Sequence, residues 1–280
     1  MNSSPILIIP GETKSIFFEI FFKSIKLTKV KSPLILICNR KILFKEIKRF
    51  KFKKDIKELN KDTLTKKKIK TKKIYLINIS NENSKVYIQK CFDLAFSLLK
   101  KGFTNKIING PINKAKTLNK KFLGVTEYVS HSFNQKKFAM LIYNKNLSVC
   151  PITTHLPISQ IKKKINQKVI KEKIIIVNNF YKKFLGFKPR IGVTGLNPHC
   201  ETIEKTGEEQ KEIIPAINQL RSEKLSIKGP FSADTFFIKK NIKKYDVVVG
   251  MYHDQVLTPL KTLFNFNAIN ITIGLPFIRV

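Results

Sequence analysis

Three of the four histidines follow short apolar runs of the kind that form buried strands: His155, His199 and His253. His253, for example, comes shortly after Val247-Val248-Val249. In open α/β sheets, ligands bind beyond the carboxyl ends of the strands. Neutral imidazole is the commonest metal ligand, and three protein ligands leave one coordination position open for substrate. The pattern favours an enzyme, with these histidines as candidate ligands of one divalent metal.

The spacing of the histidines does not decide between a metal site and a simpler alternative. They lie 44 and 54 residues apart, and no local His-x-x-x-His pattern is present. Taken singly, each is better explained as a hydrogen-bonded loop residue. Taken together, at equivalent positions after strands, they support a shared metal site about as well as the simpler alternative. The fourth histidine, His131, has no strand before it, and we expect it on the surface.

A second group of residues is suited to binding a phosphate or carboxylate. Lys261, Asn270 and Arg279 lie near predicted strand and loop ends, and Thr126 offers a hydroxyl after Gly124. Arginine binds anions with two parallel hydrogen bonds, whereas lysine supplies a point charge. No Gly-x-Gly-x-x-Gly or Walker sequence occurs, so neither a Rossmann fingerprint nor a P-loop is predicted.

Strands that alternate with helices must position these residues. We expect strands at residues 5–9, 33–38, 74–79, 106–109, 138–143, 147–152, 190–195, 246–250 and 269–273. Helices are expected at residues 15–26, 86–101, 159–185 and 207–224, while residues 40–73 cannot be divided, and residues 229–235 are expected to be a loop. This alternation predicts an α/β fold with a parallel or mixed sheet. No linker marks a domain boundary, so residues 1–280 are treated as one catalytic unit of two interwoven lobes.

Composition excludes several classes of protein. The formal charge is +35, but only five of the 54 basic residues are arginine, and lysine is abundant together with Ile, Asn and Phe. That joint bias is typical of an AT-rich coding sequence, and the lysine runs lack interleaved aromatic residues for stacking bases. The four cysteines form no Cys-x-x-Cys pair, which favours reduced thiols. No signal peptide or membrane span is predicted, so we expect a soluble cytoplasmic protein.

The motifs together resemble the 4-hydroxythreonine-4-phosphate dehydrogenase family of pyridoxal 5′-phosphate biosynthesis. They include Gly195-Leu196-Asn197-Pro198-His199 and Met251-Tyr252-His253-Asp254-Gln255. Others occur in order at residues 9–12, 109–114, 124–127, 153–157, 233–235 and 270–279. The resemblance spans nearly the whole chain.

The resemblance implies an isocitrate/isopropylmalate-dehydrogenase-like fold, with two α/β lobes and a cleft between them. It implies a homodimer whose active site lies at the subunit interface. It also implies that a divalent metal (Zn, Mg or Co) is bound by His155, His199 and His253. The implied substrate contacts are Thr126, Lys261, Asn270 and Arg279. Asp234, Asp254 and Lys261 are the candidate catalytic residues, the two aspartates for proton transfer or for orienting the ligands.

The implied reaction is metal-dependent oxidation of 4-phosphohydroxy-L-threonine by NAD or NADP. Loss of carbon dioxide from the 3-oxo acid then gives 3-amino-2-oxopropyl phosphate. An alternative within the superfamily is a dehydrogenase of another four-carbon 4-phosphorylated hydroxy acid, such as threonate or erythronate phosphate. An alternative of another class is a basic nucleic-acid-binding protein, which the three post-strand histidines do not favour.

Three departures from the family pattern bear on these expectations. The family usually has histidine at the position of Val125. The family also usually has small residues, including glycine, directly after the position of His199, where this chain has Cys200-Glu201-Thr202. Family members also continue beyond the position of Val280, through an Asp-His-Gly-Thr segment that helps to form the dinucleotide site. That segment is absent here, so we assign no cofactor-binding residue.

Overall fold

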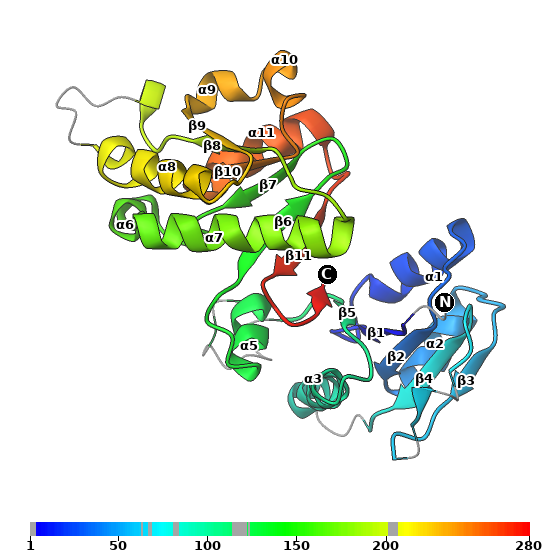
Figure 1. Ribbon diagram of the computed structural model, residues 1–280. Helices are drawn as coiled ribbons and strands as arrows, with labels where there is room; N and C mark the ends of the chain where they lie inside the picture. The colour runs from blue at the N-terminus through cyan, green and yellow to red at the C-terminus, as the bar shows by residue number, and fades with distance from the viewer. Residues whose placement is uncertain are drawn as a thin grey trace. The chain divides into compact units, whose positions relative to one another are not determined.

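The computed structural model describes residues 4–62, 64–66, 69–80, 84–113, 122, 124–200 and 207–280. The chain divides into two compact units (Figure 1). Unit 1 consists of Met1–Asn134 together with Pro276–Val280, and unit 2 consists of Gln135–Leu275. The last residues of the chain therefore return to the first unit.

Unit 1 is built on a parallel sheet with the strand order β3-β4-β2-β1-β5-β12. Its strands are β1 (Ile6–Ile9), β2 (Leu34–Cys38), β3 (Ile56–Glu58), β4 (Ile74–Asn78), β5 (Lys106–Asn109) and β12 (Ile278–Arg279). Its helices are α1 (Phe17–Leu27), α2 (Arg40–Arg49), α3 (Ser84–Lys100) and α5 (Val125–Ser132).

The strands of unit 1 form because their apolar residues are buried on both faces of the sheet, as parallel strands require. Every residue of β2 is buried. On one face, Ile8 and Leu36 pack with Phe18 and Phe22 of α1. Helix α3 contacts β1 and β2.

Unit 2 contains a mixed sheet with the strand order β11-β6-β7-β10-β8-β9. Its strands are β6 (Ala139–Tyr143), β7 (Ser148–Pro151), β8 (Ile191–Thr194), β9 (Ile227–Phe231), β10 (Val247–Gly250) and β11 (Ile269–Ile273). Strand β6 is antiparallel to both β11 and β7, whereas β7, β10, β8 and β9 are parallel. The strands predicted at residues 138–143 and 147–152 are confirmed, and they pair with each other as an antiparallel hairpin.

Helices and short turns connect the strands of unit 2. They are α6 (Ile158–Ile161), η2 (Lys162–Lys164), α7 (Gln167–Phe180), η3 (Tyr181–Leu185), η4 (Pro198–Cys200), η5 (Glu209–Ile213), α8 (Ile214–Ser222), α9 (Ala233–Phe236), α10 (Lys239–Ile242) and α11 (His253–Phe264). Helices α7 and α8 lie side by side (Figure 1). Val248 of β10 packs with Val256 and Leu260 of α11. Side chains alternate along a strand, so Val247 and Val249, both buried, face the opposite side of the sheet.

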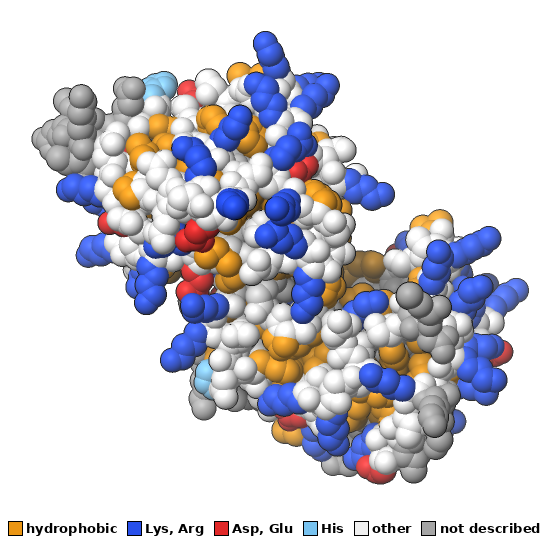
Figure 2. Space-filling model, in the orientation of Figure 1, with side chains coloured by type: hydrophobic (Ala, Val, Ile, Leu, Met, Phe, Trp, Pro, Cys, Tyr) orange, Lys and Arg blue, Asp and Glu red, His pale blue; other side chains and the backbone are white. Residues whose placement is uncertain are grey.

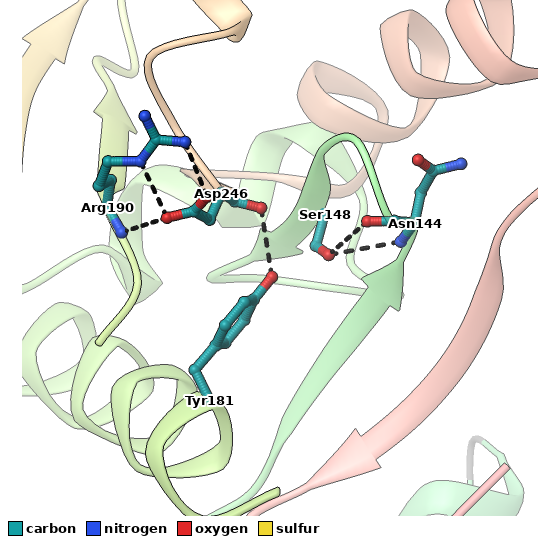
Figure 3. Close-up of polar contacts among 5 residues, drawn as sticks. All are labelled: Asn144, Ser148, Tyr181, Arg190 and Asp246. Carbon is teal, nitrogen blue, oxygen red and sulfur yellow. Dashed lines mark hydrogen bonds and ion pairs between the residues drawn. The ribbon is translucent and has the colours of Figure 1, made fainter. Parts of the chain in front are cut away.

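A network at the amino ends of β7, β8 and β10 fixes these strands before they reach the predicted site (Figure 3). The guanidinium of Arg190 donates to both carboxylate oxygens of Asp246, at 2.8 and 3.1 Å, and its backbone N–H donates to the same carboxylate. The carbonyl oxygen of Asp246 accepts from the Tyr181 hydroxyl and from the backbone N–H of Ser148. One aspartate thus connects all three strands.

Two sequence-based expectations for the fold were wrong, and one undivided region is now assigned. Residues 229–231 were expected in a loop but belong to β9, at the edge of the sheet, where the missing N–H of Pro230 is tolerated. The helix expected at residues 159–185 is interrupted between η2 and α7, where Asn166 begins α7 by accepting a hydrogen bond from the Val169 N–H. Residues 40–73, left undivided, contain α2 and β3.

Candidate active site

Four adjacent parallel strands of unit 2 end at one edge of the sheet, in the order β7-β10-β8-β9. Each is followed by a predicted site residue: His155 after β7, His253 after β10, His199 after β8 and Asp234 after β9. Strand β10 lies between β7 and β8, so the loop with His253 lies between the loops with the other two histidines. The sheet therefore supplies the arrangement expected of a site at its carboxyl edge.

His155 and His253 lie next to each other in this edge. Their ring centroids are 6.1 Å apart. His253 is the first residue of α11, and its Nδ1 lies 2.6 Å from the Asp254 carboxylate. When Nδ1 carries the proton and donates it to this carboxylate, Nε2 is the nitrogen left to bind a ligand. A contact of this kind favours the tautomer with the proton on Nδ1 and leaves Nε2 available as a donor atom.

His199 pairs with Asp234 instead. Its Nδ1 lies 4.0 Å from the Asp234 carboxylate, and the imidazole is 75% exposed. Its backbone has a φ of 57°, a left-handed conformation that is unusual for histidine. The Ser232 hydroxyl donates to Asp234 at 2.5 Å, and this hydrogen bond lowers the pKa of Asp234 below its ordinary value, with a smaller contribution from His199. Asp234 is therefore ionised at neutral pH.

A buried carboxylate holds the loop that carries His199. Glu209, which is 1% exposed, accepts hydrogen bonds at 2.7 Å from the backbone N–H groups of Leu196 and Asn197. The amide of Asn197 donates to Glu209 at 2.8 Å and to Glu208 at 3.0 Å. These hydrogen bonds hold the loop at Leu196 and Asn197, and Asn197 is two residues before His199.

The predicted anion-binding residues Thr126 and Arg279 meet in unit 1. The Arg279 guanidinium donates from Nη1 to the Thr126 hydroxyl at 3.1 Å and from Nε to the side-chain oxygen Oδ1 of Asn109 at 2.8 Å. Burial lowers the pKa of Arg279 to about 10, and the charge of Glu127 opposes that shift. Arg279 is still protonated at neutral pH, so it presents a positive charge with few waters around it, which suits a phosphate group.

The other predicted contacts lie elsewhere. Lys261 is exposed on α11, eight residues after His253, and Asn270 is exposed on β11. Val125, at the position where the family usually has histidine, is the first residue of α5. Lys114, Glu201 and Thr202, which the sequence analysis also named, lie outside the described residues.

Comparison with known proteins decides the family. Residues 29–280 match the model of the family described as "Pyridoxal phosphate biosynthetic protein PdxA". The chain belongs to this family. It is accordingly an oxidoreductase of pyridoxal phosphate biosynthesis.

Relatives and solved structures of this family agree over most of the chain. The 4-hydroxythreonine-4-phosphate dehydrogenase of Sulfurihydrogenibium sp. (strain YO3AOP1) is 34% identical over 96% of this chain and 86% of the relative. That of Wigglesworthia glossinidia brevipalpis is 34% identical over 99% of this chain and 87% of the relative. The crystal structure of the Klebsiella pneumoniae enzyme has a TM-score of 0.82 and 28% identity, covering 99% of this chain and 90% of that one. The predicted isocitrate/isopropylmalate-dehydrogenase-like fold is confirmed.

The resemblance implies that the three histidines of this family member bind a divalent metal, and their positions bear on that assignment. Within the described ranges, no three histidine, cysteine, aspartate or glutamate side chains are grouped closely enough to hold a metal ion. The structure brings His155 to His253, and His199 to Asp234, but not all three histidines to one point. The chemistry of the donors still fits a divalent metal, because three imidazoles from adjacent strand ends, one of them oriented by a carboxylate, form a common catalytic set.

Sequence reasoning assigned no role to three residues of this family member that the structure connects to the site. They are Asn109, which binds Arg279; Glu209, which holds the His199 loop; and Gln255, which joins the ends of β8 and β10. Asn109 and Gln255 lie inside motifs named above, which was the available signal. Glu209 lies in the helix predicted at residues 207–224, and nothing in the sequence shows that it is buried.

A search of the described helices found none long and apolar enough to cross a membrane.

Proposed function

We propose that this chain oxidises 4-phosphohydroxy-L-threonine to its 3-oxo acid with NAD or NADP, and that this acid loses carbon dioxide to give 3-amino-2-oxopropyl phosphate. The observation that carries the proposal is the set of histidines and acidic residues after four adjacent parallel strands, in a chain that belongs to this family. Dehydrogenation requires a nicotinamide acceptor, to which we assign no binding residues.

The histidines are proposed to hold a divalent metal. His155, His199 and His253 would supply the imidazole nitrogens, and Asp254 would keep His253 in the required tautomer through the contact at 2.6 Å. When bound, such a metal polarises the substrate oxygen and stabilises negative charge on it. The metal could be zinc, magnesium or cobalt.

The remaining roles belong to side chains whose charge states suit them. Arg279 and Thr126 are proposed to bind the substrate phosphate, with Lys261 and Asn270 as further contacts. Asp234, ionised at neutral pH, can accept the proton of the substrate hydroxyl as hydride leaves the same carbon. Lys261 is the candidate donor of the proton that replaces carbon dioxide on the substrate carbon.

We further propose a homodimer that takes active-site residues from both subunits, as the family resemblance implies. A cytoplasmic location is proposed as well, and it is supported by the four cysteines, none of which forms a disulfide within the described residues.

The deciding experiment is NAD(P) reduction by the purified chain with 4-phosphohydroxythreonine. We expect turnover that a chelator abolishes and a re-added divalent metal restores. His199→Ala should lower kcat at least about a hundredfold while circular dichroism remains unchanged. The matched control is His131→Ala, because His131 is exposed on α5 and has no proposed role.

Two results would contradict this function. Turnover that is indifferent to chelator and to His199→Ala would remove the metal. Turnover only with 4-phosphothreonate or 4-phosphoerythronate would identify the chain as a dehydrogenase of another four-carbon phosphorylated acid. Val125 makes that second substrate class worth assaying, since it lies next to the proposed phosphate contact Thr126.

A further inference from the structure

Arg279 is held by an uncharged acceptor, the side chain of Asn109. Nε of Arg279 donates to Oδ1 of Asn109 at 2.8 Å, and the amide nitrogen of Asn109 donates to the carbonyl oxygen of Gly110 at 3.0 Å. Because a guanidinium can only donate, the atom of Asn109 that faces it must be the oxygen, and the hydrogen bond to Gly110 requires the same orientation. The two hydrogen bonds together fix the amide against the guanidinium.

The backbones of Asn109 and Arg279 are joined as well, and both residues belong to unit 1. Asn109 is the last residue of β5, and its N–H donates to the carbonyl oxygen of Val280 at 3.1 Å. The N–H of Val280 donates in turn to the carbonyl oxygen of Ile107 at 3.1 Å, within the ladder that pairs β12 with β5. The ladder sets the backbone of Arg279 and Asn109 holds its Nε, so the arginine side chain is ordered before a ligand binds.

The neutrality of Asn109 matters for an anionic ligand. Glu127, in the first turn of α5, already acts on Arg279 through its negative charge, whereas Asn109 and the Thr126 hydroxyl add none. These four side chains are half-buried, so charges among them are screened less than charges on the surface. A carboxylate at position 109 would accept the same hydrogen bond from Nε but would place a second negative charge beside the guanidinium.

We propose that Asn109 is a positioning residue for phosphate binding, which holds the Arg279 guanidinium in one orientation without neutralising it. This inference rests on the assignment of Arg279 to the substrate phosphate in the proposed function. Asn109 acts through Arg279 and not by contact with the phosphate. Orienting the guanidinium in advance lowers the entropic cost of binding, and an uncharged partner leaves the positive charge to the phosphate.

The test is the binding of 4-phosphohydroxythreonine to the purified full chain, measured by titration calorimetry without NAD(P) so that no turnover occurs. Asn109→Ala removes the hydrogen bond to Nε and should weaken binding about tenfold. Asn109→Asp keeps the size and the acceptor but adds a charge, and it should weaken binding about a hundredfold. The matched control is Asn218→Asp, because Asn218 accepts from Arg221 at 3.3 Å on the exposed surface of α8, and it should leave the affinity unchanged.

The order of the two variants separates positioning from a merely structural role. If Asn109 only stabilised the end of β5, the nearly isosteric aspartate would be tolerated better than alanine, whereas the proposal requires aspartate to bind the substrate less tightly. Steady-state kinetics give a second readout: both variants should raise KM and change kcat by less than about twofold, because the phosphate is held equally before and during the reaction. A loss of folded protein would instead lower kcat and leave KM unchanged. If Asn109→Asp does not fold, the tenfold loss expected for Asn109→Ala decides alone.

Failure of this inference differs from failure of the proposed function. Wild-type affinity in Asn109→Ala, or an affinity in Asn109→Asp equal to or higher than that in Asn109→Ala, would overturn the positioning role and leave Arg279 as a phosphate contact. If Arg279→Ala bound the substrate as tightly as the wild type, the phosphate assignment would fail, and this inference with it. A wild-type chain that bound no 4-phosphohydroxythreonine would contradict the proposed function itself.

Discussion

Arg279 is the residue whose environment is most informative about substrate binding. Only five arginines occur in the chain, and this one is half-buried, with its guanidinium held by Asn109 and Thr126. We expect Arg279→Lys to raise KM for the phosphorylated substrate about tenfold or more, because lysine cannot form the bidentate pair of hydrogen bonds that a guanidinium makes to a phosphate. Steady-state kinetics would check this, with the exposed Arg221→Lys as control.

The pH dependence of KM provides a second check on Arg279. A pKa of about 10 leaves the guanidinium charged from pH 6 to pH 9, so it should contribute no change in KM over that range. Substrate binding should weaken as the pH approaches 10, where the charge is lost. A KM for Arg279→Lys equal to that of the wild type would remove Arg279 from the phosphate site.

At the scale of single residues, the sequence identified the side chains of the candidate site, but it did not show which of them lie next to each other. The positions of His155, His199 and His253 after strands are confirmed, because apolar runs locate strand ends well. The pairing of His199 with Asp234 could not be foreseen, since Asp234 follows β9, whose Gly229-Pro230 pair was taken for a loop. Glu209 is buried by tertiary packing, and no local sequence pattern predicts that a glutamate is buried.

Among the elements, the loops after β1 and β5 approach each other so closely at Gly110 that no side chain fits at that position. A Cβ on Gly110 would lie 2.0 Å from the carbonyl oxygen of Pro10 and 2.6 Å from the Phe17 ring. Gly110→Ala should therefore destabilise the protein by about 3 kcal/mol. The neighbouring residue, Asn109, binds Arg279, so the same substitution should disturb the proposed phosphate site.

Chemical unfolding would measure this effect of Gly110→Ala. The control is Gly102→Ala, where nothing lies within 4 Å of the added atom and only the left-handed φ of 66° is unfavourable. It should lower the free energy of unfolding by about 1 kcal/mol. Equal losses in the two variants would show that the close approach at Gly110 relaxes without cost.

The junction of β7, β8 and β10 predicts a pH dependence of stability. Burial alone would raise the pKa of Asp246, but the hydrogen bonds and charge of Arg190 outweigh it and lower that pKa. The stabilisation is therefore complete above the ordinary aspartate pKa of about 4 and is lost as the pH falls through the lowered value. Asp246→Asn should reduce the free energy of unfolding by about 1–2 kcal/mol at pH 7.

The difference between wild type and Asp246→Asn should shrink as the pH falls from 4 to 2, as urea unfolding at several pH values would show. Asp55→Asn, at an exposed aspartate, serves as the control and should change stability little at either pH. A difference that stays constant down to pH 2 would show that the ionised carboxylate is not what stabilises the junction.

Most strands and helices were predictable because short β-branched runs and amphipathic periodicity are local features. The parts that were not, β9 and β12, depend on distant partners. β12 has only two residues, and its ladder to β5 forms because the chain returns to unit 1 at Pro276. No pattern within ten residues of Arg279 shows that return.

For the whole molecule, the charge of +35 raises the question of nucleic-acid binding. Figure 2 shows lysine and arginine side chains scattered over the visible face, with hydrophobic and uncharged surface between them. A scattered charge attracts polyanions at long range but makes few simultaneous phosphate contacts, so its effect is lost as salt rises. We infer that the lysines and arginines on this face do not form a specific nucleic-acid-binding surface.

This inference predicts weak, salt-sensitive association with DNA. A fluorescent duplex should bind in about 20 mM salt and be released by about 200 mM, because few phosphates are contacted at once. His199→Ala, which should abolish turnover, should leave the titration unchanged, since it removes none of the lysine and arginine side chains. Sequence-selective binding that persisted at 200 mM salt would require a basic groove and would make nucleic acid a second partner of this enzyme. Loss of DNA binding at the same salt concentration for a duplex and a single strand would favour the scattered surface charge alone.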